Sequence, residues 1–90
     1  MHIEVEWDDA KAEANLRKHG VSFEEAATCL LDPMALAQED DAAAGEARWM
    51  HTGMSTSVRL LTVVYTLRAA DRVRLISARK ATHNEASSYA

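Results

Sequence analysis

The sequence has few of the residues that mark specialised classes of protein. Its 90 residues include one cysteine, one proline and three glycines. With a single cysteine, one chain can form neither an internal disulfide nor a cysteine-based zinc site. Cys29 lies among alanine, threonine and leucine, without a cationic neighbour that would favour its thiolate. We therefore interpret it as a helix-packing residue rather than a nucleophile.

Long apolar runs are absent as well. The longest such stretch, residues 60–67, is interrupted by two threonines and is much shorter than the roughly 20 residues that span a bilayer. The first residues show neither the basic nor the apolar region of a secretory signal. We therefore expect a cytoplasmic protein without a membrane partner. With 48% hydrophobic and 27% charged residues, the composition is typical of a globular chain, and the length predicts a single domain over residues 1–90.

Positive charge is in deficit, and the net charge of -4 argues against a nucleic-acid partner. The charges are nevertheless divided along the chain. Residues 1–46 carry twelve acids against three cations, whereas residues 47–90 carry seven cations against two acids. Six of those seven cations are arginines, whose planar guanidinium suits phosphate or carboxylate. The second half could bind an anionic partner, or it could be a solvated strand face paired with the acidic helices of the same molecule.

Local patterns predict a strand and two helices in the first third of the chain. Residues 2–7 alternate between polar and apolar side chains, as in a half-buried strand. Asp8 can cap a helix over Asp9–His19, and Gly20 can end it in the left-handed conformation. A second helix begins with an S-x-x-E capping box and reaches Asp32-Pro33, where the residue before proline is pushed out of the helical region.

The second half has the period of two that is typical of strands. The predicted strands form an antiparallel meander and cover residues 34–39, 47–53, 58–68 and 72–79. Residues 40–46 are expected to form a mobile loop, and Ser55–Ser57 and Ala69–Asp71 are expected to form hairpin turns. A T-x-x-E capping box predicts a closing helix over His83–Tyr89. The order β-α-α-β-β-β-β-α is that of an α+β fold, with an antiparallel sheet and helices packed on one face.

Motifs of the common enzyme classes are missing. The sequence has no phosphate-binding loop, dinucleotide fingerprint, zinc-protease helix or nucleophile elbow. The four histidines are scattered without the spacing of metal ligands. We therefore expect neither a metal nor a cofactor.

The chemistry that remains open to the chain is cationic. Deprotonating an arginine at neutral pH would cost roughly 9 kcal/mol, so arginines can act only as electrostatic clamps. If the activity is phosphodiester cleavage, Arg59 and Arg79 are the candidates to hold the phosphate. Lys11 and His19 lie eight residues apart and share a broad face of the first helix. They are the candidates for proton transfer and substrate binding.

Each of these candidates also has a structural explanation. His19, beside Gly20 at a helix end, can complement the helix dipole, and Lys11 can be a solvated surface residue. Arg79, at the close of an apolar strand face, needs an anionic partner, which Glu4 or Glu6 of a neighbouring strand could supply. The capping box explains the presence of Glu85 without a catalytic role. The residue types alone do not choose between these interpretations.

Two sets of residues carry a resemblance to a known family. The first half contains W-D-x-x-K-x-x-x-N-x-x-K-H-G-x-x-F-x-x-A over residues 7–26. The second half adds Arg48-Trp49, Gly53, Ser55, Arg59, V-V-Y-T at 63–66 and R-L-I-S-A-R at 74–79. Together they resemble the BrnT family of toxins over nearly the whole chain. The resemblance implies a RelE-like fold and a ribonuclease that stops translation. It also implies neutralisation by a small BrnA antitoxin, with operator DNA bound chiefly through that antitoxin.

With this resemblance, we expect contacts to RNA from four further cations, Arg48, Arg74, Lys80 and Lys18. The chain departs from the family pattern at two positions. Val58 stands where the family usually has glycine, and Ala86 stands where it usually has arginine in the last helix. These departures and the acidic balance support an alternative, a catalytically degenerate relative that retains antitoxin binding or a role in repression. An exposed sheet edge could pair with the antitoxin or with a second copy of the chain.

Overall fold

The computed structural model describes residues 3–40 and 47–89. It confirms the predicted order of elements. These are β1 (Glu4–Glu6), α1 (Asp9–His19), α2 (Phe23–Cys29), β2 (Leu36–Asp40), β3 (Arg48–Met54), β4 (Leu60–Ala69), β5 (Arg72–Lys80) and α3 (His83–Ser88). Residue 2 of the predicted first strand lies outside the described residues, as does the expected mobile loop beyond Asp40. None of the helices described here has the length and apolar character that crossing a bilayer requires.

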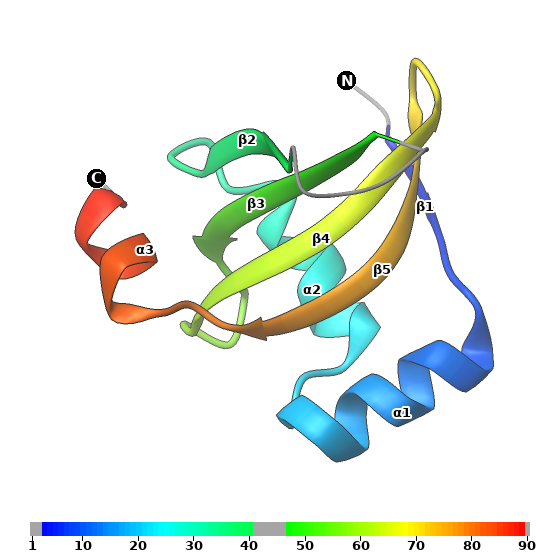
Figure 1. Cartoon of the computed structure of the whole chain (residues 1–90), viewed down its shortest axis with the longest axis horizontal. Coiled ribbons are helices and arrows are strands. Elements are labelled where there is room, and N and C mark those ends of the chain that lie inside the picture. Colours follow the sequence, from blue (N-terminus) through cyan, green and yellow to red (C-terminus); the bar gives the residue numbers. More distant parts are fainter. Residues whose placement is uncertain (1–2, 41–46, 90) are drawn as a thin grey trace.

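The five strands form one twisted sheet in the order β1-β5-β4-β3-β2 (Figure 1). The predicted antiparallel meander from β2 to β5 is confirmed. The expectation of a wholly antiparallel sheet is wrong at one edge, because β1 pairs with β5 in parallel, with Val5 beside Val73. Polar–apolar alternation indicates which face each side chain takes, but it does not indicate strand direction. The sheet is therefore mixed.

The boundaries of α1 follow from its two caps. A carboxylate oxygen of Asp8 accepts hydrogen bonds from the backbone N–H groups of Ala10 and Lys11, at 2.8 and 3.2 Å. At the other end, Gly20 has a φ of 69° and donates its N–H to the carbonyl of Leu16. A left-handed residue at this position satisfies a carbonyl that the helix leaves open. Both ends of α1 were thus predictable from local sequence.

Helix α2 ends at Cys29, earlier than predicted. The carboxylate of Asp32 accepts hydrogen bonds from the backbone N–H of Met34, at 2.9 Å, and from that of Met54, at 2.8 Å. These bonds stabilise a turn that leads into β2. Leu31 is 73% exposed, so a further turn of helix would bury little apolar surface. The helix therefore stops before Asp32-Pro33, the pair that marks its predicted end.

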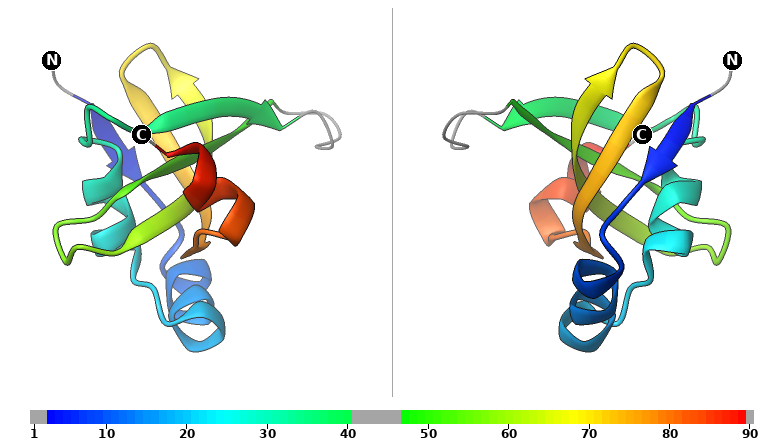
Figure 2. Two further views of the ribbon diagram at one scale, coloured as in Figure 1. Left: turned by 90° about the vertical axis from the view of Figure 1, so that its left-hand side faces the viewer. Right: turned by 90° about the vertical axis from the view of Figure 1, so that its right-hand side faces the viewer.

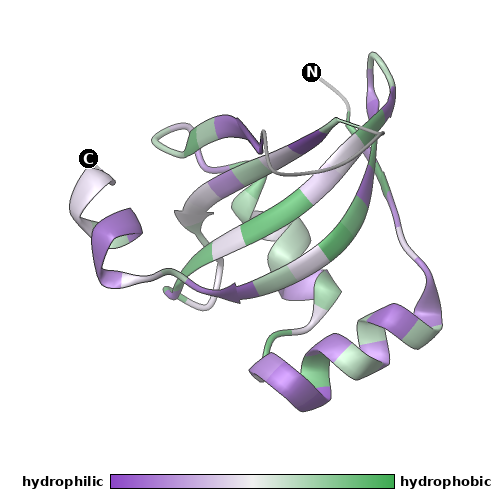
Figure 3. Cartoon of the chain, viewed as in Figure 1, coloured by the Kyte–Doolittle hydropathy of each residue, from purple (hydrophilic) through white to green (hydrophobic). Residues whose placement is uncertain are grey.

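The core lies between α2 and the sheet, where apolar residues run along β4 and β5 (Figure 3). Its fully buried members are Val21, Phe23, Ala26, Cys29, Leu61, Val63, Leu75 and Ala78. Burial raises the pKa of the Cys29 thiol to about 11, as do the carboxylates of Glu25 and Asp32. The packing interpretation of Cys29 therefore holds, because a thiol of this pKa is protonated at neutral pH.

Helix α3 lies on the opposite face of the sheet from α2 (Figure 2). The prediction that all helices pack on one face is therefore wrong for α3. Its six residues include no buried side chain, so it has no apolar face to place on the core. It is held instead by polar contacts. Glu85 accepts a hydrogen bond from Thr62 of β4, and Tyr89 donates one to Asp32.

Gly53 marks the closest approach of β3 to the end of α2. A Cβ at this position would lie 2.9 Å from the backbone oxygen of Cys29 and 3.1 Å from Cβ of Ala35. Because the first of these contacts is with backbone, it cannot be relieved by a rotamer change. We expect Gly53→Ala to lower the free energy of unfolding by about 2 kcal/mol in urea denaturation. Ala37→Ser, on an exposed strand, should change it by less than about 0.5 kcal/mol. Equal effects would contradict the steric argument.

Candidate active site

Arg59 and Arg79 lie at the end of the sheet where β4 begins and β5 ends, and Lys11 and His19 lie in a groove between α1 and β5. The carboxyl end of α1 is fastened there by Asn15, which is buried. Its side-chain amide donates to the carbonyls of Ala78, at 2.8 Å, and Val21, at 3.0 Å, and its oxygen accepts from the N–H of Ala78 at 3.0 Å. Since β1 pairs only with residues 72–74 of β5, Asn15 satisfies edge groups that no strand covers.

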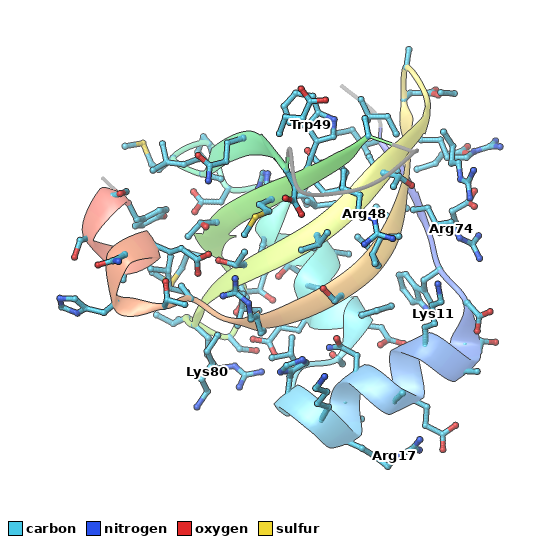
Figure 4. All side chains as sticks on the ribbon, viewed as in Figure 1. Lys11, Arg17, Arg48, Trp49, Arg74 and Lys80 are labelled. Carbon is cyan, nitrogen blue, oxygen red and sulfur yellow. The ribbon has the colours of Figure 1, made fainter. Side chains whose placement is uncertain are left out.

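A groove of about 310 Å³ runs between α1 and β5. Lys11, Lys18 and His19 line it from the helix, and Ile76 and Ser77 line it from the strand. The expectation that Lys11 and His19 share a face is therefore confirmed. Figure 4 shows Lys11 on the side of α1 nearer the sheet, whereas Arg17 points away from it. Arg17 instead forms an exposed ion pair of 3.1 Å with Glu13.

Arg59 follows the β3–β4 turn and is tied to α2. Its guanidinium donates to both carboxylate oxygens of Glu25, with an Nε–Oε2 distance of 2.9 Å, and to the carbonyl of Gly20 at 3.1 Å. These bonds, with a further one from Ser55, hold the pKa of Glu25 below its usual range, although burial opposes the shift. Arg59 thus lies next to the residue that follows His19, on the α2 side of the sheet.

Arg79 is held on the other face by α3. It donates from Nη1 and Nη2 to the two carboxylate oxygens of Glu85, at 2.7 and 3.0 Å. Glu85 also accepts from the backbone N–H of Thr82, at 2.8 Å, and from the hydroxyl of Thr62, at 2.9 Å. The pairing with Arg79 is the main reason that the pKa of Glu85 falls to about 2. The expectation that Glu4 or Glu6 supplies the partner of Arg79 is wrong, because these glutamates pair with Arg72 and Arg74, and Arg79 pairs with Glu85 of α3.

Arg59 and Arg79 therefore lie on opposite faces at one end of the sheet, and each forms an ion pair with a glutamate. A guanidinium has five N–H donors, and the bonds to described residues leave Nη1 of Arg59 and Nε of Arg79 unused. Each arginine can contact a phosphate without releasing its glutamate. Because each pair is close to neutral, the net positive charge here comes from other cations. In the described part of the chain, no ion pair engages Lys11, Lys18, His19 or Lys80.

The four cations expected to contact RNA are divided in the structure (Figure 4). Lys18 lines the α1–β5 groove, and Lys80 is exposed beside Arg79 at the end of β5. Arg74 is at the opposite end of β5, where its Nη1 donates to Glu6 at 2.8 Å. Arg48 begins β3 beside Asp40 of β2. The structure thus brings Lys18 and Lys80 to the candidate site and leaves Arg48 and Arg74 away from it.

Sequence reasoning missed three residues that build this end of the sheet. Asn15 was noted only as part of a motif, although it joins α1 to β5. Ser77 is part of the R-L-I-S-A-R motif, and it also lines the groove. Glu25 was read as half of a capping box, but the N-cap Ser22 receives only the N–H of Glu25, and the carboxylate binds Arg59. The signal for Asn15 was its polarity among the alanines of α1. For Glu25, no residue nearby in the sequence indicated the contact with Arg59.

Val58 has the only left-handed backbone among the described residues other than glycine, with a φ of 59°. A β-branched residue is strained in this region, and the side chain is 80% exposed, so packing does not compensate. We expect Val58→Gly to raise the free energy of unfolding by about 1 kcal/mol, measured by urea denaturation. Ser57→Gly, at the preceding ordinary φ, should lower it slightly. A loss of stability in Val58→Gly would contradict the inference that the backbone of Val58 is strained.

The lowered pKa of Glu85 predicts a pH-dependent contribution to stability. Because the folded-state value of about 2 lies below the ordinary 4.5, the contribution is complete above pH 4.5 and is lost as the pH falls toward 2. We expect Glu85→Gln to lower the free energy of unfolding by about 2 kcal/mol at pH 6 and by much less at pH 2.5. Denaturant titrations at both pH values test this. Glu13→Gln, in an exposed pair, should have little effect at either pH, and a pH-independent deficit in Glu85→Gln would refute the linkage.

Comparison with known proteins supports the resemblance noted from the sequence. The family model described as the ribonuclease toxin BrnT of type II toxin–antitoxin systems matches residues 7–85. The fold is similar to the 1.1 Å crystal structure of the Brucella abortus ribonuclease toxin BrnT, with a TM-score of 0.65 and 23% sequence identity. That alignment covers 90% of this chain and 99% of the Brucella chain. No curated protein sequence matches the chain.

Proposed function

Since the chain belongs to the BrnT family of ribonuclease toxins of type II toxin–antitoxin systems, we propose that it is a metal-independent endoribonuclease. In this proposal it acts in the cytoplasm as a single domain, stops translation by cutting RNA, and is neutralised by a BrnA-type antitoxin. Operator DNA is bound only by the complex with that antitoxin. The observation that carries the proposal is the groove in which Lys11, Lys18 and His19 lie together beside Ser77.

The groove offers the two kinds of group that RNA cleavage needs. Attack of the 2′-hydroxyl on the adjacent phosphorus breaks the bond to the 5′-oxygen and leaves a cyclic phosphate. The reaction requires transfer of a proton from the 2′-hydroxyl to the departing 5′-oxygen and stabilisation of the charge on phosphorus. Histidine is the residue type suited to exchange that proton at neutral pH, so His19 is assigned to it. Lys11 and Lys18, which no ion pair in the described residues neutralises, are assigned to the phosphate.

Arg59 and Arg79 are assigned to binding the RNA on either side of this groove. Arg59 reaches the carbonyl of Gly20, and Arg79 follows Ala78, which Asn15 holds against α1. Their unused N–H groups can donate to phosphate oxygens while the glutamates keep each guanidinium in place. Lys80 adds charge at the same end. Arg48 and Arg74 are assigned to more distant phosphates of the same strand.

The test is an RNA cleavage assay with the purified chain in the presence of EDTA. Cleavage that survives chelation and yields cyclic phosphate ends supports the proposal, and loss of all cleavage on chelation contradicts metal independence. Arg59→Ala with Arg79→Ala should reduce cleavage strongly, although each change also removes a structural ion pair. Folding is therefore checked by circular dichroism. Arg17→Ala, which removes one exposed cation of α1, is the matched control and should cleave normally.

A second candidate function is favoured by the two ion pairs. Because Glu25 and Glu85 already occupy the candidate clamps, the chain could be a degenerate relative that binds the antitoxin and takes part in repression without cutting RNA. This candidate predicts folded protein that leaves RNA intact at every concentration yet binds the antitoxin with nanomolar affinity. Failure to bind the antitoxin would exclude it.

A further inference from the structure

Strand β2 is an open edge of the sheet. It pairs only with β3, and four of its five residues are exposed, so side chains on both of its faces reach solvent. In Figure 2 the strand extends beyond the helices. An edge strand of this kind presents unpaired N–H and C=O groups to any extended segment. Lysine and proline, which commonly block such edges, are absent from residues 36–40.

Apolar side chains adjoin this edge. Leu31 is 73% exposed, Met34 53% and Leu36 43%, and all three lie on the segment that enters β2. Leu36 also lines a groove of about 240 Å³ between the β2–β3 hairpin and α3, with Met50 on the sheet side and Asn84 on the helix side. Figure 3 shows the change from apolar to hydrophilic residues along β2. The groove can receive an apolar side chain from a segment that adds to β2.

The chain segment that leads through α2 into β2 carries charge of one sign, and Arg48 of β3 is the cation that adjoins it, opposite Asp40. Residues 20–47 contain no lysine or arginine. Among the described residues of this stretch, Glu24 and Glu39 are exposed, and Asp32 and Asp40 are partly exposed. An RNA chain is repelled by such a surface, whereas a cationic segment is attracted. A second copy of the chain, paired edge to edge through β2, would bring the same carboxylates against one another.

We propose that the antitoxin adds an extended, cationic segment to the outer edge of β2 and places an apolar side chain in the groove beside Leu36 and Met50. The identification of the partner as an antitoxin rests on the proposed function. The surface shares no lining residue with the α1–β5 groove, and it meets the proposed RNA-binding residues only at Glu85, the partner of Arg79, which also lines the groove beside Leu36.

The experiment measures binding of the purified antitoxin from the same operon by isothermal titration calorimetry. Leu36→Lys with Gln38→Lys blocks the edge with cations, and we expect it to weaken binding at least 100-fold. Leu67→Lys with Ala69→Lys adds the same two charges at exposed positions of β4, where Leu67 is 52% exposed, and should bind within threefold of the parent. Binding to the parent should weaken as salt rises. Amide exchange should show new protection in β2 of the complex.

Equal affinity of the two lysine variants would overturn the inference, as would protection in the complex that spares β2. So would sedimentation that shows a dimer of the chain alone, abolished by Leu36→Lys with Gln38→Lys, because the edge would then take a second copy. Both variants should cleave RNA as the parent does. Binding at β2 by a chain that leaves RNA intact would refute only the ribonuclease proposal. Active cleavage without binding at β2 would refute only the docking surface.

Discussion

Replacing Asn15 by alanine is expected to lower the free energy of unfolding by about 3 kcal/mol. The change leaves the N–H and C=O of Ala78 and the carbonyl of Val21 without their partner in a buried setting. Each unsatisfied buried group costs on the order of 1 to 3 kcal/mol, and partial entry of water keeps the sum near the lower end. For a chain of this length the loss corresponds to a fall in melting temperature of roughly 10 to 20 °C.

Urea denaturation followed by circular dichroism measures this effect. Asn84→Ala removes an exposed amide from α3 and should change the free energy of unfolding by less than about 0.5 kcal/mol. Asn15→Asp provides a second check. Its oxygens can accept from the N–H of Ala78, but they cannot donate to either carbonyl, and they bring an unpaired charge into a buried site. Asn15→Asp should therefore be at least as unstable as Asn15→Ala, and an aspartate as stable as asparagine would contradict the assigned bonds.

Replacing His19 by glutamine is expected to reduce the rate of RNA cleavage by about 10² to 10⁴-fold. Glutamine retains a polar side chain at the end of α1 but cannot exchange a proton at neutral pH. If His19 acts on the 2′-hydroxyl, the turnover number should fall while KM stays within about threefold. Lys18→Ala should show the complementary pattern, because loss of a phosphate contact raises KM and weakens the dependence of binding on salt.

Single-turnover cleavage of a short RNA substrate separates the two effects. Arg17→Ala is the matched control, since Arg17 lies on the same helix but points away from the groove. Equal unfolding transitions in all variants would show that the helix is intact. Unchanged turnover in His19→Gln would leave His19 with its alternative role, the favourable interaction of a histidine with the carboxyl end of a helix dipole.

Local features of the fold could be predicted, because their causes lie within a few residues. The ends of α1 depend on Asp8 and Gly20, and the start of α3 depends on Thr82 and Glu85, whose capping box is present. The direction of β1 and the position of α3 were not predictable in this way. They depend on contacts between residues far apart in sequence, such as Glu4 with Arg72 and Thr62 with Glu85.

In the candidate site, too, some features follow from local sequence and others depend on residues far apart in the chain. That Lys11 and His19 share one face follows from helical periodicity, and the groove confirms it. The pairing of Arg59 with Glu25 joins residues 34 positions apart, and the only local pattern at this glutamate, the capping box with Ser22, does not indicate it. The sequence therefore indicated which cations were available, but not which of them the fold neutralises.

Because β1 pairs with β5 in parallel and Asn15 bonds to Ala78, the α1–β5 groove joins segments from the two ends of the chain. It can form only late in synthesis. The helix side of the α1–β5 groove is complete once residue 19 has been made, but its strand side waits for residues 76 and 77, and the anchor at Ala78 comes later still. During translation, the groove therefore cannot form until residues 76–78 of the 90-residue chain have been made. A chain that ends before residue 76 carries the cations of α1 without the strand side of the groove, and on the proposed mechanism it should leave RNA intact.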